Sequence, residues 1–342
     1  MNEESILFLK SISKVTIKED LANNLFISKI QPGSNLAHII DINKMQLLLF
    51  KHLKEQACLE YLNNEICNSY ELKLFYLQFK YQEYLNALKN IVSLFEINNV
   101  NYSIIKGFSF IDELYTINNI IYRDFSDVDI LISPNDISKV DRSLAELGMV
   151  QGVISGNSIK KAERKDIINW RLNSHQLHEY IMLSTYSHIS PFFSICVDIN
   201  TTIFEGGVML PPINTDDILE NTIVKESNGF RFKCLNYTYS LLQMCYHFYK
   251  DTVYEVKRKS HDNYCLLKFC DIREYIIKHY EKINWNLFVD IVNSNGIASQ
   301  IYHTLRLVSS FYGDLILENL SHRIKPTKNY IDDEIDWNKL LF

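Results

Sequence analysis

The N-terminal part of the chain carries apolar side chains at spacings of three and four, which is the spacing of one face of an α-helix. The clearest stretch is LKLFYLQFKYQEYLNALKNIVSLF, at residues 72–95. Its apolar face consists of Leu74, Leu77, Tyr81, Leu85, Leu88, Val92 and Phe95. Because these residues can line one buried surface, the pattern predicts an N-terminal helical region over residues 1–98.

The pattern changes after Asn98, where short apolar runs suited to β-strands are mixed with a helical segment. The helix is expected over residues 136–149, because Asp136 suits its N-cap and Gly148 follows its last turn. Strands are expected over residues 100–107, 127–133, 177–184 and 192–204. Strands mixed with helices predict an α+β fold, with a mixed β-sheet and helices in a core over residues 99–205.

Helical spacing returns after the predicted core and predicts a C-terminal helical domain over residues 206–320. Asn236 or Thr238 suits the cap of one helix, and Asn284 suits the cap of another. The last residues, 321–342, are expected to form a charged tail. Helical regions therefore flank the predicted core on both sides in the sequence.

Composition and charge narrow the class of protein. The chain has 342 residues, of which 47% are apolar and 22% charged, so we expect a globular protein of two or three domains. The formal net charge is -6, and the pI is about 5.9. No strong basic field indicates a nucleic-acid partner, although a local basic groove is compatible with that total. Nucleic acid is therefore the less favoured partner.

The sequence lacks the signals of membrane or secreted proteins. No apolar run reaches the roughly 18 residues that span a bilayer. The opening MNEESILFLK is acidic before it is apolar, the reverse of a secretory signal. The seven cysteines are scattered and form no CxxC pair, which argues against a disulfide framework or a zinc knuckle. We therefore expect a cytoplasmic protein without a membrane partner.

Two carboxylates, Asp127 and Asp129, stand at the start of a predicted strand within YRDFSDVDILI. Side chains two apart in a strand share a face, so these like charges repel unless a cation lies between them. Mg²⁺ is the natural cation, because it takes one or two carboxylates and completes its shell with water and phosphate oxygens. Asp198, in SICVDINTT, is the best third carboxylate. Three such residues converging on one point would hold two metal ions.

These motifs resemble those of the nucleotidyltransferase superfamily that includes DNA polymerase β and the antibiotic nucleotidyltransferases. The likeness is carried by IIKG, then SDVDILI, then a later strand with VDIN. A more local likeness is to a bacterial family of uncharacterised nucleotidyltransferases, over about residues 40–315. It is carried by KG, YRDFSDVDILI, LGM, CYHFYKD and KFCDI, in this order.

The resemblance implies transfer of a nucleoside monophosphate from an NTP to an acceptor, with loss of pyrophosphate. Asp127 and Asp129 would bind both metal ions, and Asp198 would bind the ion that activates the acceptor hydroxyl. Gly107 would let the backbone approach the triphosphate, and Ser109 could donate a hydrogen bond to it.

One departure affects the phosphate site. The superfamily usually has Gly followed directly by Gly or Ser, whereas here Phe108 separates Gly107 from Ser109. Lys106 is therefore a further candidate for phosphate binding. Arg123 is another, because its guanidinium fork suits phosphate oxygens.

Three further residues are candidates for the substrate side of the site. His178 and Glu179 lie in HQLHEY, where a zinc site would need a helix and a third ligand, and the stretch reads instead as a strand. His247 lies on an apolar helix, where the family resemblance also places a histidine. For each of them a structural role is the alternative.

The favoured hypothesis is a Mg²⁺-dependent nucleotidyltransferase that uses an NTP, with ATP favoured, and an unidentified small-molecule acceptor. One alternative is a degenerate protein of the same fold that only binds a nucleotide or a partner, suggested by the altered Gly-Phe-Ser turn. Another is a toxin-like enzyme that modifies RNA or protein. A structural alternative for the aspartates is a turn or a salt bridge beside Arg123, which could also neutralise Asp124.

Overall fold

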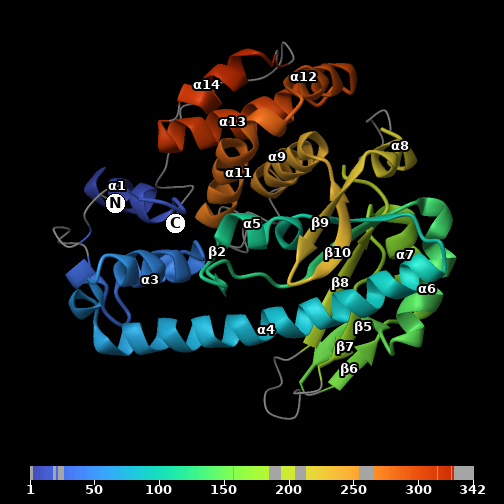
Figure 1. Ribbon diagram of the computed structural model, residues 1–342, viewed down its shortest axis with the longest axis horizontal. Coiled ribbons are helices and arrows are strands. Elements are labelled where there is room, and N and C mark those ends of the chain that lie inside the picture. The colour runs from blue at the N-terminus through green and yellow to red at the C-terminus, as the bar shows by residue number, and fades with distance from the viewer. Residues whose placement is uncertain are drawn as a thin grey trace. The chain divides into compact units, whose positions relative to one another are not determined.

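The computed structural model shows an α+β protein with a mixed sheet and helical segments before and after it (Figure 1). The described residues are 3–17, 21, 27–156, 158–184, 194–204, 213–253, 265–313, 315–324 and 326. They form two compact units. Unit 1 takes its residues from the ranges 1–77, 113–124 and 244–342, and unit 2 from 78–112 and 125–243.

Unit 2 contains an eight-stranded sheet, in the order β6-β5-β7-β8-β4-β1-β10-β9 among the described residues. The β4–β8 and β1–β10 pairs are parallel, and the other neighbours are antiparallel. The strands are β1 (Tyr102–Ile105), β4 (Val128–Ile132), β5 (Val150–Ser155), β6 (Ser158–Lys161), β7 (Tyr180–Leu183), β8 (Ser194–Asn200), β9 (Thr222–Ser227) and β10 (Phe230–Leu235).

The helices of unit 2 support this sheet. The long helix α4 (Asn64–Ile97) brings Phe95 into an edge contact with Tyr102 of β1, at 5.8 Å between ring centroids. Tyr180 of β7 donates a hydrogen bond to Asp141 of α6 (Ile137–Glu146). Two shorter helices, α7 (Arg164–Asn173) and α8 (Thr215–Glu220), complete the set. The strand β4 is buried along its whole length, so the residues at its start have a fixed position.

Unit 1 is mainly helical. Its C-terminal helices pack through aromatic contacts, such as Phe269 on Phe248 and on Phe311 at 4.9 and 5.5 Å between ring centroids. A short hairpin, β2 (Thr116–Ile117) and β3 (Ile120–Ile121), joins this unit. The helices are α1 (Glu3–Ile12), α2 (Asn35–Ile42), α3 (Gln46–Glu55), α11 (Leu266–His279), α12 (Trp285–Ser294), α13 (Ala298–Tyr312) and α14 (Leu315–His322).

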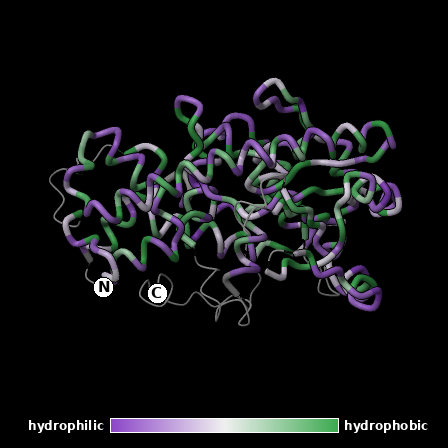
Figure 2. Tube along the Cα trace, turned by 90° about the horizontal axis from the view of Figure 1, so that it is seen from below, coloured by the Kyte–Doolittle hydropathy of each residue, from purple (hydrophilic) through white to green (hydrophobic). Residues whose placement is uncertain are grey.

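Three of the described helices cross the unit boundary. The helices α4, α5 (Ile111–Tyr115) and α9 (Tyr237–Val253) each contribute residues to both units. Hydrophobic and hydrophilic positions alternate at short intervals along the trace, as expected of elements with one buried face (Figure 2). No helix in the described ranges is long and apolar enough to cross a membrane.

The strands and the helix predicted for the core are confirmed. The predicted strands at 100–107, 127–133, 177–184 and 192–204 contain β1, β4, β7 and β8, and the predicted helix at 136–149 contains α6. Two predicted caps are confirmed: Asn236 accepts hydrogen bonds from two backbone amides at the start of α9, and Asn284 accepts one at the start of α12. Asp136 stands at the N-cap position of α6, but its side chain makes no capping hydrogen bond. Residues 192–193 and most of the predicted tail, 327–342, lie outside the described residues.

The predicted helical domain over residues 206–320 needs a correction, because after α8 it contains a β-hairpin that belongs to the sheet. Strands β9 and β10 are joined by Asn228 and Gly229, both with positive φ angles of 48° and 71°. That is the backbone of a tight hairpin turn, and Asn-Gly is its strongest sequence signal. The hairpin of β5 and β6 and the helix α7 were also not predicted.

Candidate active site

The register of two parallel strands brings the predicted aspartates together. Asp129 of β4 and Asp198 of β8 are direct Cα partners, so their side chains leave the same face of the sheet. Asp127 lies directly before β4, and its charge contributes to the raised pKa of both Asp129 and Asp198, so it is close to both. Asp129 and Asp198 are 69 positions apart in the sequence, and the pairing of β4 with β8 brings them together. The predicted convergence of these two residues therefore follows from the sheet.

A lysine ammonium group lies against this cluster. The Nζ atom of Lys106 donates to Oδ1 of Asp129 at 2.5 Å, and only 18% of the Lys106 side chain is exposed. Lys106 directly follows β1, and its backbone has a φ of 55° and a ψ of −147°. Such a backbone is strained for any residue other than glycine, and this kind of strain concentrates at functional sites.

Two amide side chains also contact the cluster. The Nδ2 atom of Asn200 donates to Oδ1 of Asp129 at 3.2 Å, and Nε2 of Gln176 donates to Oδ2 of Asp198 at 3.1 Å. Asn200 lies at the end of β8, and Gln176 pairs with it through an isolated β-bridge. Each of these carboxylates is therefore held by an amide group.

Burial and mutual repulsion change the acidity of the cluster. Burial, followed by the charges of Asp129 and Asp127, raises the pKa of Asp198 to about 8. Burial likewise raises the pKa of Asp129, although the ammonium of Lys106 acts in the opposite direction. The Asp129 carboxylate in turn raises the pKa of Lys106, despite the burial that would lower it. These carboxylates are costly to ionise together, and a bound cation would remove that cost.

The donor set fits a hard divalent cation. Asp127, Asp129 and Asp198 offer only oxygen ligands, which is the preference of Mg²⁺ and Mn²⁺. Among the described residues, no three His, Cys, Asp or Glu side chains are already arranged as a metal site. In this arrangement the ammonium of Lys106 supplies the positive charge beside Asp129. A metal would therefore need part of its shell from water and substrate phosphate, as Mg²⁺ normally does.

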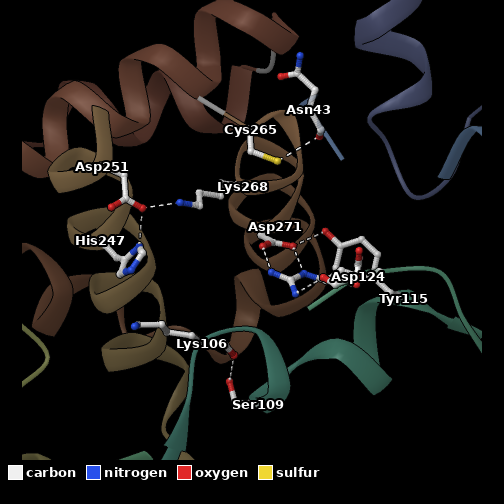
Figure 3. Close-up of polar contacts among 11 residues, drawn as sticks. Asn43, Lys106, Ser109, Tyr115, Asp124, His247, Asp251, Cys265, Lys268 and Asp271 are labelled. Carbon is white, nitrogen blue, oxygen red and sulfur yellow. Dashed lines mark hydrogen bonds and ion pairs between the residues drawn. The ribbon is translucent and has the colours of Figure 1, made fainter. Parts of the chain in front are cut away.

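The Gly-Phe-Ser turn owes its shape to Phe108. Gly107–Ser109 form a 3-10 turn directly after Lys106. Phe108 is 4% exposed. The centroid of its ring lies 5.5 Å from that of Tyr81 on α4 and 5.6 Å from that of Phe125. The hydroxyl of Ser109 donates to the backbone oxygen of Lys106 at 2.7 Å (Figure 3). The extra residue thus anchors the turn to α4, and the hydroxyl of Ser109 closes the turn.

Arg123 was predicted to bind phosphate, and in this structure it forms an ion pair with Asp271. It belongs to unit 1, where its Nε and Nη2 atoms donate to the two oxygens of Asp271 at 2.8 and 2.6 Å. The hydroxyl of Tyr115 donates to the same carboxylate at 2.6 Å (Figure 3). The Asp124 carboxylate, proposed as an alternative partner of Arg123, instead lies 3.6 Å from Lys73. Arg123 therefore serves a buried ion pair in this structure.

The residues predicted for the substrate side fall in different places. Glu179 is next to the carboxylate cluster: burial, with help from the Asp127 charge, raises its pKa, and Glu179 contributes to the raised pKa of Asp198. The ring of His178 lies 5.8 Å from that of Trp170 on α7. Glu179 thus joins the cluster, whereas His178 contacts a helix beside the sheet.

His247 lies on α9 in unit 1. Its Nδ1 atom is 3.1 Å from Oδ2 of Asp251, and Lys268 of α11 forms an ion pair with the same carboxylate (Figure 3). These charges strongly lower the pKa of Asp251 although burial would raise it. The arrangement ties two helices together, which favours the structural interpretation of His247.

Sequence reasoning missed Asn200 and Gln176. Asn200 stands two residues after Asp198 in VDIN, so the period of the strand was the available signal that it shares a face with the carboxylates. Gln176 gave no such signal, because the isolated bridge that places it lies outside any named strand.

A mixed sheet that presents aspartates from two adjacent strands on one face, with helices at both ends of the chain, fits a nucleotidyltransferase-type fold. The chain belongs to the family described as uncharacterised nucleotidyltransferase, whose model matches residues 33–313. The family identifies the protein as a nucleotidyltransferase enzyme. A search of curated proteins gave no significant match.

Proposed function

We propose that the protein transfers a nucleoside monophosphate from an NTP, with ATP favoured, to a hydroxyl group of a small-molecule acceptor and releases pyrophosphate. The observation that supports this most directly is the pairing of Asp129 with Asp198 on parallel strands, with the charge of Asp127 close to both. Two Mg²⁺ ions held there would neutralise the triphosphate and the attacking oxygen. The net charge of -6 favours a small acceptor over a nucleic acid.

The residues divide into two roles. Asp127 and Asp129 would hold the cations against the triphosphate, and Asp198 would hold the cation that activates the acceptor hydroxyl. The acceptor oxygen forms a bond to the α-phosphorus, and the bond from that phosphorus to the pyrophosphate oxygen breaks. Asp198 takes the acceptor proton, which it can do once bound cations keep its carboxylate ionised. Glu179, whose pKa is raised by burial and by the Asp127 charge, is the residue beside this cluster that we assign to the acceptor side.

The phosphate contacts come from the turn after β1. Lys106 is bound to Asp129 in this structure, and it would exchange that carboxylate for triphosphate oxygens when a cation takes its place. Gly107 allows the backbone of the turn to approach the phosphates. Ser109 shapes the turn through its hydrogen bond to Lys106 and is a less direct phosphate ligand than the sequence indicated.

The test is pyrophosphate release by purified protein with Mg²⁺, each NTP and a metabolite extract. Asp127→Ala, Asp129→Ala and Asp198→Ala should each lower turnover by about 10³-fold, or about 4 kcal/mol of transition-state stabilisation. Asp166→Ala is the control, because Asp166 lies exposed on α7. Turnover of the three variants at the level of the control would contradict the proposed site.

Single-stranded RNA is a second candidate acceptor, favoured by one local feature. Residues 158–173 carry five Lys or Arg and two Asp or Glu, a net +3 within an acidic chain. Trp170 in this segment is 42% exposed, and exposed aromatic rings beside cations can stack bases. RNA binding that weakens with salt, by about 0.7 in log affinity per log unit of salt for each phosphate contacted, would support this acceptor.

A catalytically degenerate nucleotide-binding protein is the remaining alternative. The altered turn that suggested it is a packed and hydrogen-bonded structure, with Phe108 buried against α4. NTP binding without any pyrophosphate release, with each class of acceptor supplied, would favour this alternative over the enzyme.

A further inference from the structure

Two amide side chains contact the carboxylate cluster from one edge. Asn200 is only 1% exposed, and its Nδ2 atom reaches both Oδ1 of Asp129 and the backbone oxygen of Asp198, each at 3.2 Å. Gln176 reaches Oδ2 of Asp198 at 3.1 Å and pairs with Asn200 through a β-bridge. The two amides are therefore neighbours, each serving a different aspartate.

The hydrogen bonds occupy only one oxygen of each carboxylate. Lys106 donates to the same Oδ1 of Asp129 that Asn200 contacts, at 2.5 Å. Within the described part of the chain, no hydrogen bond reaches Oδ2 of Asp129 or Oδ1 of Asp198. An ionised carboxylate accepts through both oxygens, so the oxygen without a protein donor is the one available to a cation.

We infer that Asn200 and Gln176 are positioning residues of the cation site. By holding one oxygen, each amide fixes the plane of its carboxylate and presents the other oxygen to a divalent cation. The inference rests on the proposed function, because it assumes that these aspartates bind metal. Mg²⁺ demands near-ideal octahedral geometry, so a carboxylate free to rotate binds it less well. Loss of such outer contacts typically weakens metal binding by about 10–100-fold.

The test measures Mn²⁺ binding to the nucleotide-free full chain by electron paramagnetic resonance. Asn200→Ala and Gln176→Ala should each weaken Mn²⁺ binding by about 10–100-fold. Asn98→Ala and Gln151→Ala are matched controls: in the same unit, the Asn98 amide donates to Leu94 and Ser143, and the Gln151 amide donates to the backbone oxygen of His178.

Turnover against Mg²⁺ concentration gives a second readout. Both variants should need about 10–100-fold more Mg²⁺ for half-maximal turnover, yet regain kcat within about threefold at saturation. Mn²⁺ affinity equal to that of the controls, or a loss of kcat that excess Mg²⁺ leaves unchanged, would overturn the inference. If Asn200→Ala misfolds because Asn200 is buried, Gln176→Ala still tests the inference. A wild-type chain that binds no Mn²⁺ contradicts the proposed function itself.

Discussion

At the scale of single residues, the site is an acidic cluster balanced by one ammonium group. Asp129 and Asp198 are partners on two paired strands, Asp127 lies directly before the first of them, and Lys106 contacts Asp129 at 2.5 Å. Burial and the neighbouring like charges raise the pKa of Asp129 and of Asp198, and their ionisation lowers the stability of the fold unless a cation is present. This repulsion destabilises the metal-free protein. Because a bound cation would remove it, the same repulsion favours metal binding.

This repulsion predicts a pH dependence. Burial and the neighbouring aspartates raise the pKa of Asp198 to about 8, above the value of about 3.9 for the unfolded chain. Between these values the folded protein keeps a proton that the unfolded chain has released. The free energy of unfolding of the metal-free protein should therefore fall as the pH rises from about 4 to about 8.

Thermal unfolding with a chelator, across this pH range, measures the effect. Asp198→Asn should remove most of the fall, because the amide does not titrate. Mg²⁺ should also raise the melting temperature more at about pH 8 than at about pH 6, since metal binds the deprotonated carboxylates. Identical pH profiles for Asp198→Asn and the wild type would show that ionisation of Asp198 does not destabilise the fold.

At the scale of elements, α4 fixes the turn that carries Lys106. Phe108 packs on Tyr81 of α4 and on Phe125 just before β4. Tyr84 of α4 donates to the backbone oxygen of Ser126 at 2.8 Å and accepts from the backbone amide of Cys196 at 3.1 Å. One helix thus supports the turn after β1 and the beginnings of β4 and β8.

Phe108→Ala should lower the free energy of unfolding by about 3–5 kcal/mol, because it leaves a cavity between α4 and the turn. It should also raise the KM for NTP, since the turn loses its anchor. Urea unfolding and steady-state kinetics measure the two effects. Phe108→Leu, which keeps most of the apolar volume, should retain most of both properties. A change in neither property for Phe108→Ala would mean that the turn is held by other contacts.

The elements of the site could largely be predicted from the sequence, and their pairing could not. The apolar run after Asp129 indicates a buried strand, and β4 is buried throughout. The Asn228-Gly229 turn carried a clear hairpin signal that the helical spacing around it obscured. The role of Asn200 depends on a contact with Asp129, 71 residues away, which only the sheet register creates. Local patterns carry no such information.

At the scale of the whole molecule, sequence neighbours separate into different units. Arg123 stands four residues before Asp127, yet it belongs to unit 1 and Asp127 belongs to unit 2. This division explains why the sequence suggested a phosphate ligand where the structure has an ion pair with Asp271. The match of the family model to residues 33–313 spans parts of both units.

Arg123→Ala should therefore lower the free energy of unfolding. It leaves Asp271 buried without its cation, which typically costs about 3–5 kcal/mol of unfolding free energy. The KM for NTP, measured well below the melting temperature, should change by less than about threefold. Arg123→Lys should recover only part of the stability, because lysine lacks the two-pronged contact. A tenfold rise in KM with unchanged stability would restore Arg123 as a phosphate ligand.

The central claim is nucleotidyl transfer at the paired aspartates, and labelled NTP tests it most directly. Purified protein would receive Mg²⁺ and each NTP, labelled at either the α or the γ phosphate, with a lysate separated into metabolites, RNA and protein. The account predicts that only α label moves to an acceptor, that it moves to the metabolite fraction, and that an Asp127→Ala/Asp129→Ala variant transfers none. Transfer of γ label, or equal α transfer by the double variant, would contradict it.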